Sequence, residues 1–385
     1  MKIIAKLENL KFTPTLLPKL KKFDINDFLS SKLSRIACYI LNYKNTCFGI
    51  SQWVSPKRTR SYPYARVYNT MSQQIRVTII PFIKDEGFDG DRDFLQWDTV
   101  SLMSLLNVYV LLGYYHKAEK NLNYMNKITN QVLDYQYLKD QLDKLINYKS
   151  SSLHWNLSQL DNSSEIAQKC KSNYQTLSTI LGARMHSSEG FDKRIKILKR
   201  SVNEFKELSR DLASDAQSRE FKTIQPKEKL IGEKAEITIK NYLGGLYYFT
   251  IDEVIVKNNK LFLIEKKHSK NSLFPSIADV KDGIVKMMLF VNLAETKISN
   301  RIVNHYPVLG LTSARVKGFC HNNMAEKEIQ KCLVRNKLSP RLKKIILSVF
   351  NEGKLNNFLV FLMDSNNPNY QDEILEDKRI IKILC

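Results

Sequence analysis

Cysteine is scarce in this sequence, and the six cysteines of the 385 residues are scattered along the chain. No two of them have the CxxC spacing of a zinc ribbon or a redox-active dithiol, so neither kind of site is expected. Isolated thiols fit a reducing compartment better than an oxidising one. We therefore expect a cytoplasmic protein.

Long apolar runs are also missing. The N-terminal segment MKIIAKLENLKF has no extended apolar stretch and no cleavage motif, so it does not predict a signal peptide. The longest apolar stretch, residues 100–115, contains Ser101, Ser104 and Asn107 and is too short to span a bilayer. We expect a buried helix there and no membrane association.

Acidic residues are far fewer than basic ones. The chain has 60 Lys and Arg against 39 Asp and Glu, a formal net charge of +21. Such a surplus indicates a polyanionic partner, either nucleic acid or a membrane surface, and nucleic acid is favoured. A coding bias towards lysine would produce the same surplus.

A basic cluster stands out in the first 75 residues: Lys57, Arg58, Arg60 and Arg66. Tyrosines are interleaved with these charges, a pattern that suits contact with phosphates and bases. The cluster is therefore a candidate DNA-binding surface. A solvated loop with packing tyrosines is an equal alternative.

Residues 75–83 (IRVTIIPFI) predict a β-strand, and the loop 84–93 that follows carries five carboxylates. A loop of this kind could hold a divalent cation, but the residue order of an EF-hand is absent. We favour a loop that caps and charges the N-terminus of a helix beginning near Trp97. A part in shaping a DNA site is left open.

From residue 98 to about 221, apolar residues recur at helical spacing, and Pro226 marks a change of composition. We expect residues 1–225 to form a mostly helical region with a short β element near 75–83. Its role would be DNA recognition, dimerisation or both. Residues 226–385 would form the second domain.

The second domain should open with a helix over residues 231–243, because apolar residues recur every four positions there. A β-hairpin should follow, with strands over residues 247–256 and 261–267 and Asn258-Asn259 as its turn. A two-residue loop at that place puts Asp252 directly opposite Glu265. Strand alternation puts Lys267 on the same face.

Two adjacent carboxylates repel each other, and a hard cation such as Mg²⁺ relieves that repulsion. Phosphodiester hydrolysis uses such an ion, and a nearby lysine can orient or deprotonate water or stabilise charge on phosphorus. Asp252 and Glu265 are therefore candidate metal ligands, with Lys267 as a catalytic residue. The alternative is a surface hairpin that happens to carry an acid pair.

These residues resemble the motif of the PD-(D/E)xK nuclease superfamily. The matching elements are Ile251-Asp252, where Ile251 replaces the usual proline, and Glu265-Lys266-Lys267 after a gap of twelve residues. GEKAE at residues 232–236 resembles the G-x-x-x-E element of some members. By that resemblance Glu236 is a further catalytic carboxylate, with Glu233 as the alternative, and a solvent-facing helix glutamate is the plainer interpretation of either.

The segment 275–293 resembles the helix that packs on this nuclease core. Its four charged residues should face outward: Asp279, Lys281, Asp282 and Lys286. Lys281 or Lys286 could then touch the DNA backbone. A solvated helix face is the simpler alternative. Residues 306–314 and 357–363 are apolar enough to be further strands.

The resemblance implies an α+β fold, with a helix-rich N-terminal region and a nuclease core whose central mixed β-sheet is flanked by helices. The chain is most similar to type II restriction endonucleases. That implies a Mg²⁺-dependent, sequence-specific endonuclease of double-stranded DNA, acting as a homodimer. A junction-resolving, repair or defence nuclease with the same core is the first alternative, and a non-catalytic helical nucleic-acid-binding protein is the second.

Overall fold

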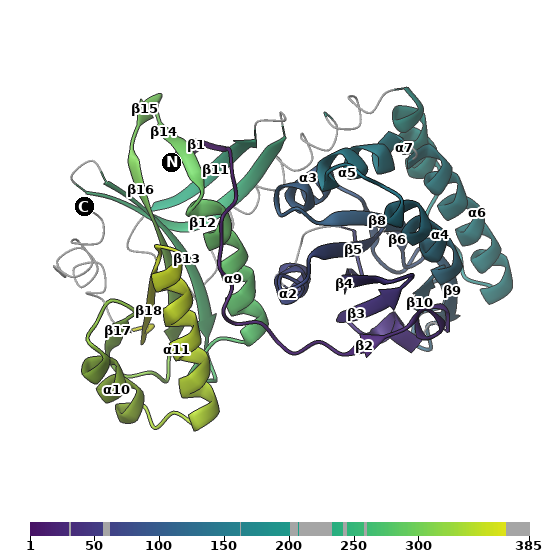
Figure 1. Ribbon diagram of the computed structural model, residues 1–385. Coiled ribbons are helices and arrows are strands. Elements are labelled where there is room, and N and C mark those ends of the chain that lie inside the picture. Colours follow the sequence, from purple (N-terminus) through teal and green to yellow (C-terminus); the bar gives the residue numbers. More distant parts are fainter. Residues whose placement is uncertain are drawn as a thin grey trace. The chain divides into compact units, whose positions relative to one another are not determined.

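The computed structural model describes residues 1–30, 32–56, 62–161, 163–200, 207, 233–241, 245–257 and 260–366. The chain is an α+β protein that divides into two compact units (Figure 1). Unit 1 comprises Met1–Leu17 and Asp215–Cys385, and unit 2 comprises Pro18–Ser214. The chain begins in unit 1, leaves it and returns, so Met1–Leu17 do not share a unit with the residues that precede the expected boundary near residue 226.

Unit 1 contains a mixed sheet of nine strands, counted over the described residues. β1 is parallel to β11, and β16 is parallel to both β13 and β18, while the other neighbours are antiparallel. The expected central mixed sheet is thereby confirmed. In spatial order the strands are β15 (Arg301–Ile302), β14 (Leu293–Ile298), β1 (Lys2–Leu7), β11 (Glu233–Asn241), β12 (Leu246–Lys257), β13 (Lys260–Ser269), β16 (Asn304–Ser313), β18 (Leu359–Asp364) and β17 (Phe319–His321).

The segment expected to be a helix over residues 231–243 is β11 instead. Ala235, Ile237 and Ile239 are buried in alternation with exposed or half-buried neighbours, which is the period of a strand. A spacing of four residues fits both periods, so it could not separate them. Pairing with β1 on one side and β12 on the other decides in favour of the strand.

The β12–β13 hairpin has the expected register as far as Glu253 opposite Ile264, but the paired residues end before the expected pair of Asp252 and Glu265. Val254 lies opposite Leu263, and Lys257 lies opposite Lys260. The turn at residues 258–259 falls outside the described residues. The expected strands at 306–314 and 357–363 are β16 and β18. β16 pairs in parallel with β13, and β18 pairs in parallel with β16.

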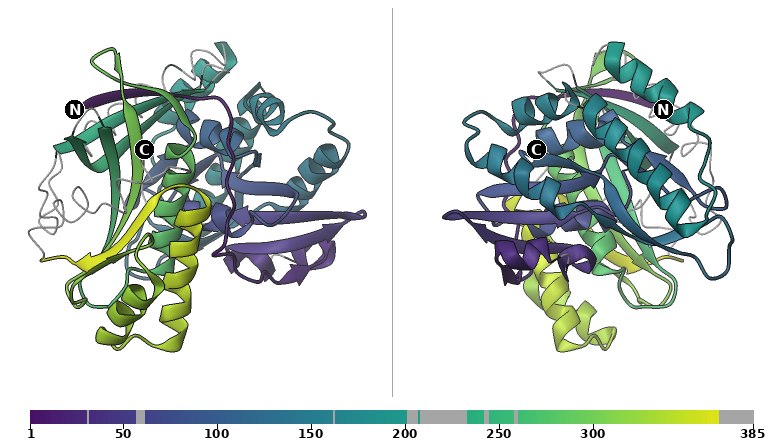
Figure 2. Two further views of the ribbon diagram at one scale, coloured as in Figure 1. Left: turned by 60° about the vertical axis from the view of Figure 1, so that its left-hand side comes forward. Right: turned by 90° about the vertical axis from the view of Figure 1, so that its right-hand side faces the viewer.

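Helices α9 (Ile277–Phe290), α10 (Glu326–Arg335) and α11 (Pro340–Leu355) pack on this sheet. Ser276 caps α9 by accepting a hydrogen bond from the Asp279 backbone N–H. Gly283 lets α9 approach β13 and β16 closely, since a Cβ atom there would lie 2.7 Å from the Leu309 side chain. Figure 2 shows from two further sides that α11 runs alongside the sheet.

The first residues of the chain are held in unit 1 by polar contacts as well as by β1. The buried Glu352 carboxylate of α11 accepts hydrogen bonds from the backbone N–H groups of Thr15 and Leu16 and from the Thr15 hydroxyl. The Asn356 side chain bonds both backbone groups of Thr13. These contacts explain why residues 1–17 belong to unit 1.

Unit 2 contains a five-stranded sheet that the sequence did not predict. The expected strand at 75–83 is confirmed as β5 (Ile75–Pro81). Its neighbour β8 (Tyr109–Gly113) lies inside the region expected to be helical, because a parallel strand buried on both faces shows a continuous apolar run rather than alternation. The other strands of this sheet are β2 (Lys22–Phe23), β3 (Cys38–Tyr43) and β4 (Thr46–Gln52).

The remaining elements of unit 2 are two β-ribbons, seven helices and a 3₁₀ turn, counted over the described residues. The ribbons are β6 (Ile83–Asp85) with β7 (Arg92–Phe94), and β9 (Tyr115–Lys120) with β10 (Ile128–Leu133). The helical elements are α1 (Ile25–Leu29), η1 (Lys32–Arg35), α2 (Tyr62–Asn69), α3 (Trp97–Leu105), α4 (Tyr135–Ile146), α5 (Ser152–Asp161), α6 (Ser163–Leu181) and α7 (Glu189–Arg200). The prediction of a mostly helical region is therefore wrong in part.

The acidic segment 84–93 joins β6 to β7 and does not cap α3. The helix begins at Trp97 as expected, but its N-cap residue Gln96 makes no capping hydrogen bond through its side chain. The carboxylates are used elsewhere: Glu86 pairs with Lys84 at 2.6 Å, and Asp85 contacts His186 at 2.8 Å. The carboxylates of this segment therefore stabilise the fold of unit 2 through contacts within it. None of the described helices is long and apolar enough to cross a membrane.

Candidate active site

Five charged side chains from three elements of unit 1 meet on one face of the sheet. Asp252 lies on β12, Glu265 and Lys267 lie on β13, and Asp282 and Lys286 lie on α9. We call these five residues the carboxylate cluster. Strand alternation places Glu265 and Lys267 on the face of Leu263, whose partner Val254 shares a face with Asp252.

Glu265 is the centre of this cluster. It is 1% exposed, and each of its oxygens contacts an ammonium group. Lys267 Nζ lies 3.0 Å from Oε1, and Lys286 Nζ lies 2.7 Å from Oε2. Lys267 Nζ also lies 2.9 Å from Asp282 Oδ2, so one lysine joins the strand carboxylate to the helix carboxylate.

Lys266 shows that the alternation of β13 holds here. Its side chain lies on the opposite face of the sheet, where it pairs with the buried Glu253 at 2.5 Å. Lys266 therefore points away from the face that carries Lys267, as strand alternation requires. Each face of the hairpin has its own acid–base pairing, and only the α9 face has a surplus of carboxylates.

A β-bulge re-aims Asp252. Glu233 lies opposite Val254 and Ala235 opposite Ile251, so one residue of β11 faces two residues of β12. Asp252 is one of those two, and its Oδ2 accepts a hydrogen bond of 2.8 Å from the Lys266 backbone N–H. Bulges of this kind are common beside active sites because they redirect a side chain.

The two strand carboxylates differ in pKa. Burial and the nearby Glu265 raise the pKa of Asp252 to about 7. Burial also acts to raise the pKa of Glu265, but Lys286 and Lys267 outweigh it and hold that pKa below its usual value. Glu265 is therefore the ionised member of the pair, and Asp252 bears the cost of the like charge.

The other charges of the cluster are also perturbed. Burial acts to lower the pKa of Lys267, but Glu265, Asp282 and Asp252 outweigh it and raise that pKa well above its usual value. Burial raises the pKa of Asp282. Asp282 Oδ1 is buried and has no hydrogen-bond partner, so this carboxylate has unused capacity to accept a bond.

The carboxylate pair fits a divalent cation that keeps most of its water ligands. The described residues contain no group of three or more His, Cys, Asp or Glu side chains arranged to hold a metal. Mg²⁺, however, is commonly bound through only one or two carboxylates. A divalent cation beside Asp252 would lower the pKa of this carboxyl further than Lys286 and Lys267 do, and the cation would share Glu265 with these two lysines. Asp252 and Glu265 would hold the ion.

The expected outward orientation of the α9 charges is wrong for three of the four. Asp282 and Lys286 belong to the carboxylate cluster, and Lys281 is only 6% exposed. α9 is buried on most sides between charged and apolar partners, so its charges do not mark a solvent face. Lys286 therefore contacts Glu265 rather than standing free for a DNA phosphate.

Sequence reasoning missed Asp282 as a site residue and gave Lys286 a different role. The signal that could have found them is their spacing of four residues, which places both on one side of a helix. That helix is the next element after β13, and most of its other residues are apolar. Two opposite charges embedded in an apolar helix indicate buried partners.

Glu236 and its alternative Glu233 lie on β11 and not on a helix. Glu236 is half-buried and pairs through its backbone with Thr250, two residues before Asp252. Glu233 is exposed. The helix-based reason for choosing between them is gone, and a catalytic part for Glu236 stays a prediction.

The predicted basic DNA-binding cluster is described only at Arg66. Lys57, Arg58 and Arg60 lie outside the described residues. Arg66 is half-buried on α2, donates a hydrogen bond to the Gln52 carbonyl and lines a cavity of about 310 Å³ in unit 2. Its guanidinium therefore joins α2 to β4.

No family model, curated protein or solved structure matches this chain. The function is therefore argued from the geometry of the carboxylate cluster and from the charge of the chain.

Proposed function

We propose that the chain is a Mg²⁺-dependent nuclease that hydrolyses phosphodiester bonds of double-stranded DNA at the carboxylate cluster. One observation carries the proposal: Asp252, Glu265 and Lys267 converge on one face of the β12–β13 hairpin, with Asp252 unusually hard to ionise. Perturbed carboxylates of this kind concentrate at functional sites.

The chemistry needs a cation beside this pair. When bound, Mg²⁺ would neutralise the phosphate, lower the pKa of a water ligand and stabilise the departing oxygen. Asp252 and Glu265 would fix its position, and α9 would exclude water from one side of Glu265. The net positive charge of +21 supports a polyanionic substrate.

Lys267 fits the role of a positive group rather than of a base. Its raised pKa keeps it protonated at neutral pH, and contacts with Glu265 and Asp282 fix its position. A fixed ammonium can orient the attacking water and stabilise the charge that builds on the phosphate oxygens. Asp282 is then a positioning residue that acts through Lys267.

The finer proposal is a type II restriction endonuclease of the PD-(D/E)xK kind. The strand–strand–helix order of β12, β13 and α9, the basic charge and the large unit 2 support it. Recognition of a palindromic site by a homodimer follows from that proposal. The free cysteines of the described residues support a cytoplasmic location. A junction-resolving, repair or defence nuclease is the alternative.

Incubation of a mixed-sequence supercoiled plasmid with the protein, with and without Mg²⁺, tests the proposal. Cleavage should require the ion, and Asp252→Asn, Glu265→Gln and Lys267→Met should each lower its rate by roughly a thousandfold or more, as losses of key electrostatic groups do. Asp279→Asn, a half-buried acid of α9 that accepts a hydrogen bond from the Ser276 hydroxyl, is the matched control and should cleave normally.

The products separate the finer alternatives. Discrete bands indicate a restriction endonuclease, whereas a smear or nicking indicates the other nucleases. Undiminished cleavage by Glu265→Gln would overturn the assignment of the active site. If the wild-type protein binds DNA but never cuts it, the nuclease proposal fails and the chain is a DNA-binding protein.

A further inference from the structure

The segment from Lys317 to Lys344, at the end of unit 1 that carries β17, is strongly basic. It contains eight Lys or Arg residues and two Glu residues, a net charge of +6 over 28 residues. None of the eight cationic side chains forms an ion pair with a carboxylate in the part of the chain that the structure describes. Glu328 is occupied at the start of α10, where it accepts a hydrogen bond from the Ala325 backbone N–H.

The segment thereby differs from the parts of unit 1 that do contain ion pairs. Elsewhere in unit 1, Lys6 and Lys297 share Glu295, and Lys266 pairs with Glu253. Ion pairs of that kind cancel most of the local field. Between residues 317 and 344 the field remains uncompensated, and like charges one helical turn apart also disfavour the helix.

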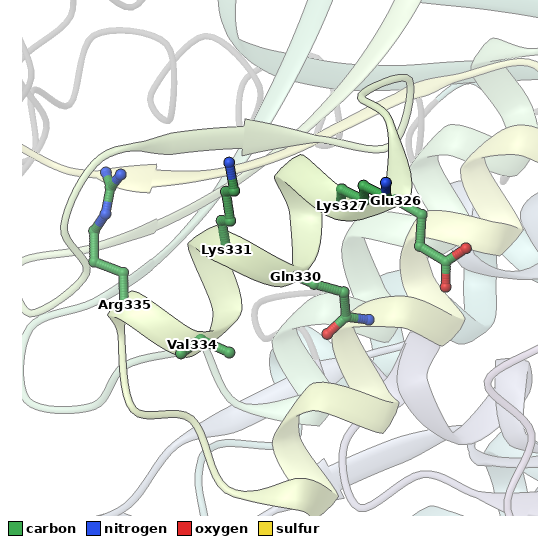
Figure 3. Close-up of a pocket in the computed structure, with 6 residues that line it drawn as sticks. All are labelled: Glu326, Lys327, Gln330, Lys331, Val334 and Arg335. Carbon is green, nitrogen blue, oxygen red and sulfur yellow. The ribbon is translucent and has the colours of Figure 1, made fainter.

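Three of these cations follow one side of α10. Lys327, Lys331 and Arg335 are spaced by four residues, which places them about 6 Å apart along the helix axis. The opposite side is apolar and faces the sheet, with Ile329 and Leu333 buried. Figure 3 shows Lys331 and Arg335 extending from the same side of the helix.

The solvent side of α10 is also hollowed. A depression of about 750 Å³ runs along it, lined by the three cations together with Glu326, Gln330 and Val334. Val334 is 60% exposed. The lining carries three cations and one carboxylate, a net charge of +2 that favours a polyanion.

The register of the sheet relates α10 to the carboxylate cluster. Lys267 pairs with Leu311, Leu311 pairs with Leu362, and Leu362 pairs with Cys320 of β17. Paired residues share a face, so Cys320 lies on the face of Lys267. Cys332 of α10 contacts Cys320, which places α10 on the same face as the cluster.

The separation suits a DNA duplex. β17 is three strands away from β13, a distance of about 14 Å at the usual strand spacing. That distance is close to the width of a major groove, about 12 Å. One duplex can therefore reach both places.

We propose that the outer side of α10, defined by Lys327, Lys331 and Arg335, binds the sugar-phosphate backbone of the DNA that is cut at the carboxylate cluster. The identity of the polyanion rests on the proposed function, but the surface itself does not. Because backbone contacts carry no sequence information, α10 would strengthen binding to all sequences alike.

The test compares two triple variants that lose the same charge. K327Q/K331Q/R335Q removes the α10 cations, and K2Q/K6Q/K297Q removes three lysines of β1 and β14 towards the other edge of the sheet. Binding to a fluorescent mixed-sequence duplex is followed by anisotropy in EDTA over a series of salt concentrations. Circular dichroism checks that both variants are folded.

The α10 variant should bind about tenfold more weakly or worse at physiological salt. The slope of log K against log salt should fall in magnitude by about 2 to 3, as the loss of three phosphate contacts predicts. The control variant should change affinity by less than threefold. Equal effects of the two variants, or unchanged affinity of the α10 variant, would overturn the proposal.

Two further arms separate this surface from the proposed function. If the α10 substitutions weaken DNA binding but the wild-type protein never cleaves DNA, the nuclease proposal is overturned and the binding surface is retained. If the α10 variant cleaves DNA with an unchanged KM, the binding surface is overturned and the nuclease proposal is retained. If the α10 variant lost binding to phosphatidylserine vesicles and kept its DNA affinity, the partner would be a membrane and the proposal would be wrong.

Discussion

Asp252 and Glu265 are neighbouring carboxylates whose pKa values move in opposite directions. Glu265 contacts both Lys267 and Lys286, whereas the Asp252 carboxylate accepts a backbone N–H and contends with the charge of Glu265. In the absence of a cation, the two lysines therefore compensate the negative charge of Glu265, whereas a negative charge on Asp252 has no ammonium group of the described residues in contact with it. This asymmetry identifies Asp252 as the group that gains most from a bound cation.

The pH dependence of stability tests this asymmetry. The pKa of Asp252 is raised to about 7 from its usual 3.8, so the folded chain keeps a proton that the unfolded chain releases between those values. Ionisation of Asp252 therefore lowers the stability of the metal-free protein as pH rises through this window. Asp252→Asn cannot ionise, and its Tm in EDTA should exceed that of the wild type at pH 8 and differ less at pH 5.

Thermal unfolding at the two pH values, with Asp279→Asn as the control, measures this difference. A Tm for Asp252→Asn that is lower than the wild-type Tm at pH 8, by as much as at pH 5, would contradict the assigned pKa.

At the scale of single elements, the hairpin was predictable and β11 was not. The β12–β13 register depends on a short loop and on local alternation, both visible in the sequence, so it led directly to Asp252 and Glu265. β11 depends on pairing with β1, which lies more than 200 residues away in the chain. The apolar spacing of β11 is compatible with either a helix or a strand, and only the distant partner decides.

The burial of α9 could not be predicted from the sequence for a related reason. Its charges have partners on β13, and the sequence of a helix that buries such charges resembles that of an amphipathic surface helix. Asp282 and Lys286 therefore became visible as site residues only once the helix was placed on the sheet. The five-stranded sheet of unit 2 was missed because β8 lacks the alternation of an exposed strand.

The contact between α11 and the first residues of the chain gives a prediction at this scale. Glu352→Ala leaves the backbone N–H groups of Thr15 and Leu16 without their buried acceptor, while the Thr15 hydroxyl keeps the Ser348 carbonyl. The free energy of unfolding of unit 1 should fall by about 3 kcal/mol, as the loss of several hydrogen bonds to a buried charge implies. Glu326→Ala, an exposed acid, should change it by less than about 0.5 kcal/mol.

Urea unfolding can assign this loss to unit 1. The three tryptophans of the chain, Trp53, Trp97 and Trp155, all belong to unit 2. Tryptophan fluorescence therefore reports unit 2 alone, whereas circular dichroism reports both units. Glu352→Ala should shift the dichroism transition and leave the fluorescence transition in place. A shift of the fluorescence transition alone would show that the contact does not act in unit 1.

At the scale of the whole molecule, the chain enters unit 1, completes unit 2 and then returns to unit 1. β1 lies between β11 and β14, so unit 1 cannot complete its sheet without the first residues. A chain that begins at Pro18 should therefore keep the tryptophan transition of unit 2 and lose the cooperative unfolding of unit 1. Unchanged cooperative unfolding of both units in that chain would contradict the division.

The central claim is that Asp252 and Glu265 hold a divalent cation. Crystals soaked in Mn²⁺, which gives an anomalous signal and takes the same oxygen ligands as Mg²⁺, test it most directly. We predict an anomalous peak within about 2.2 Å of one oxygen from each carboxylate, the range of such bonds, and no such peak in Glu265→Gln crystals. A wild-type protein that cleaves DNA with Mn²⁺ but binds the ion elsewhere would contradict the claim.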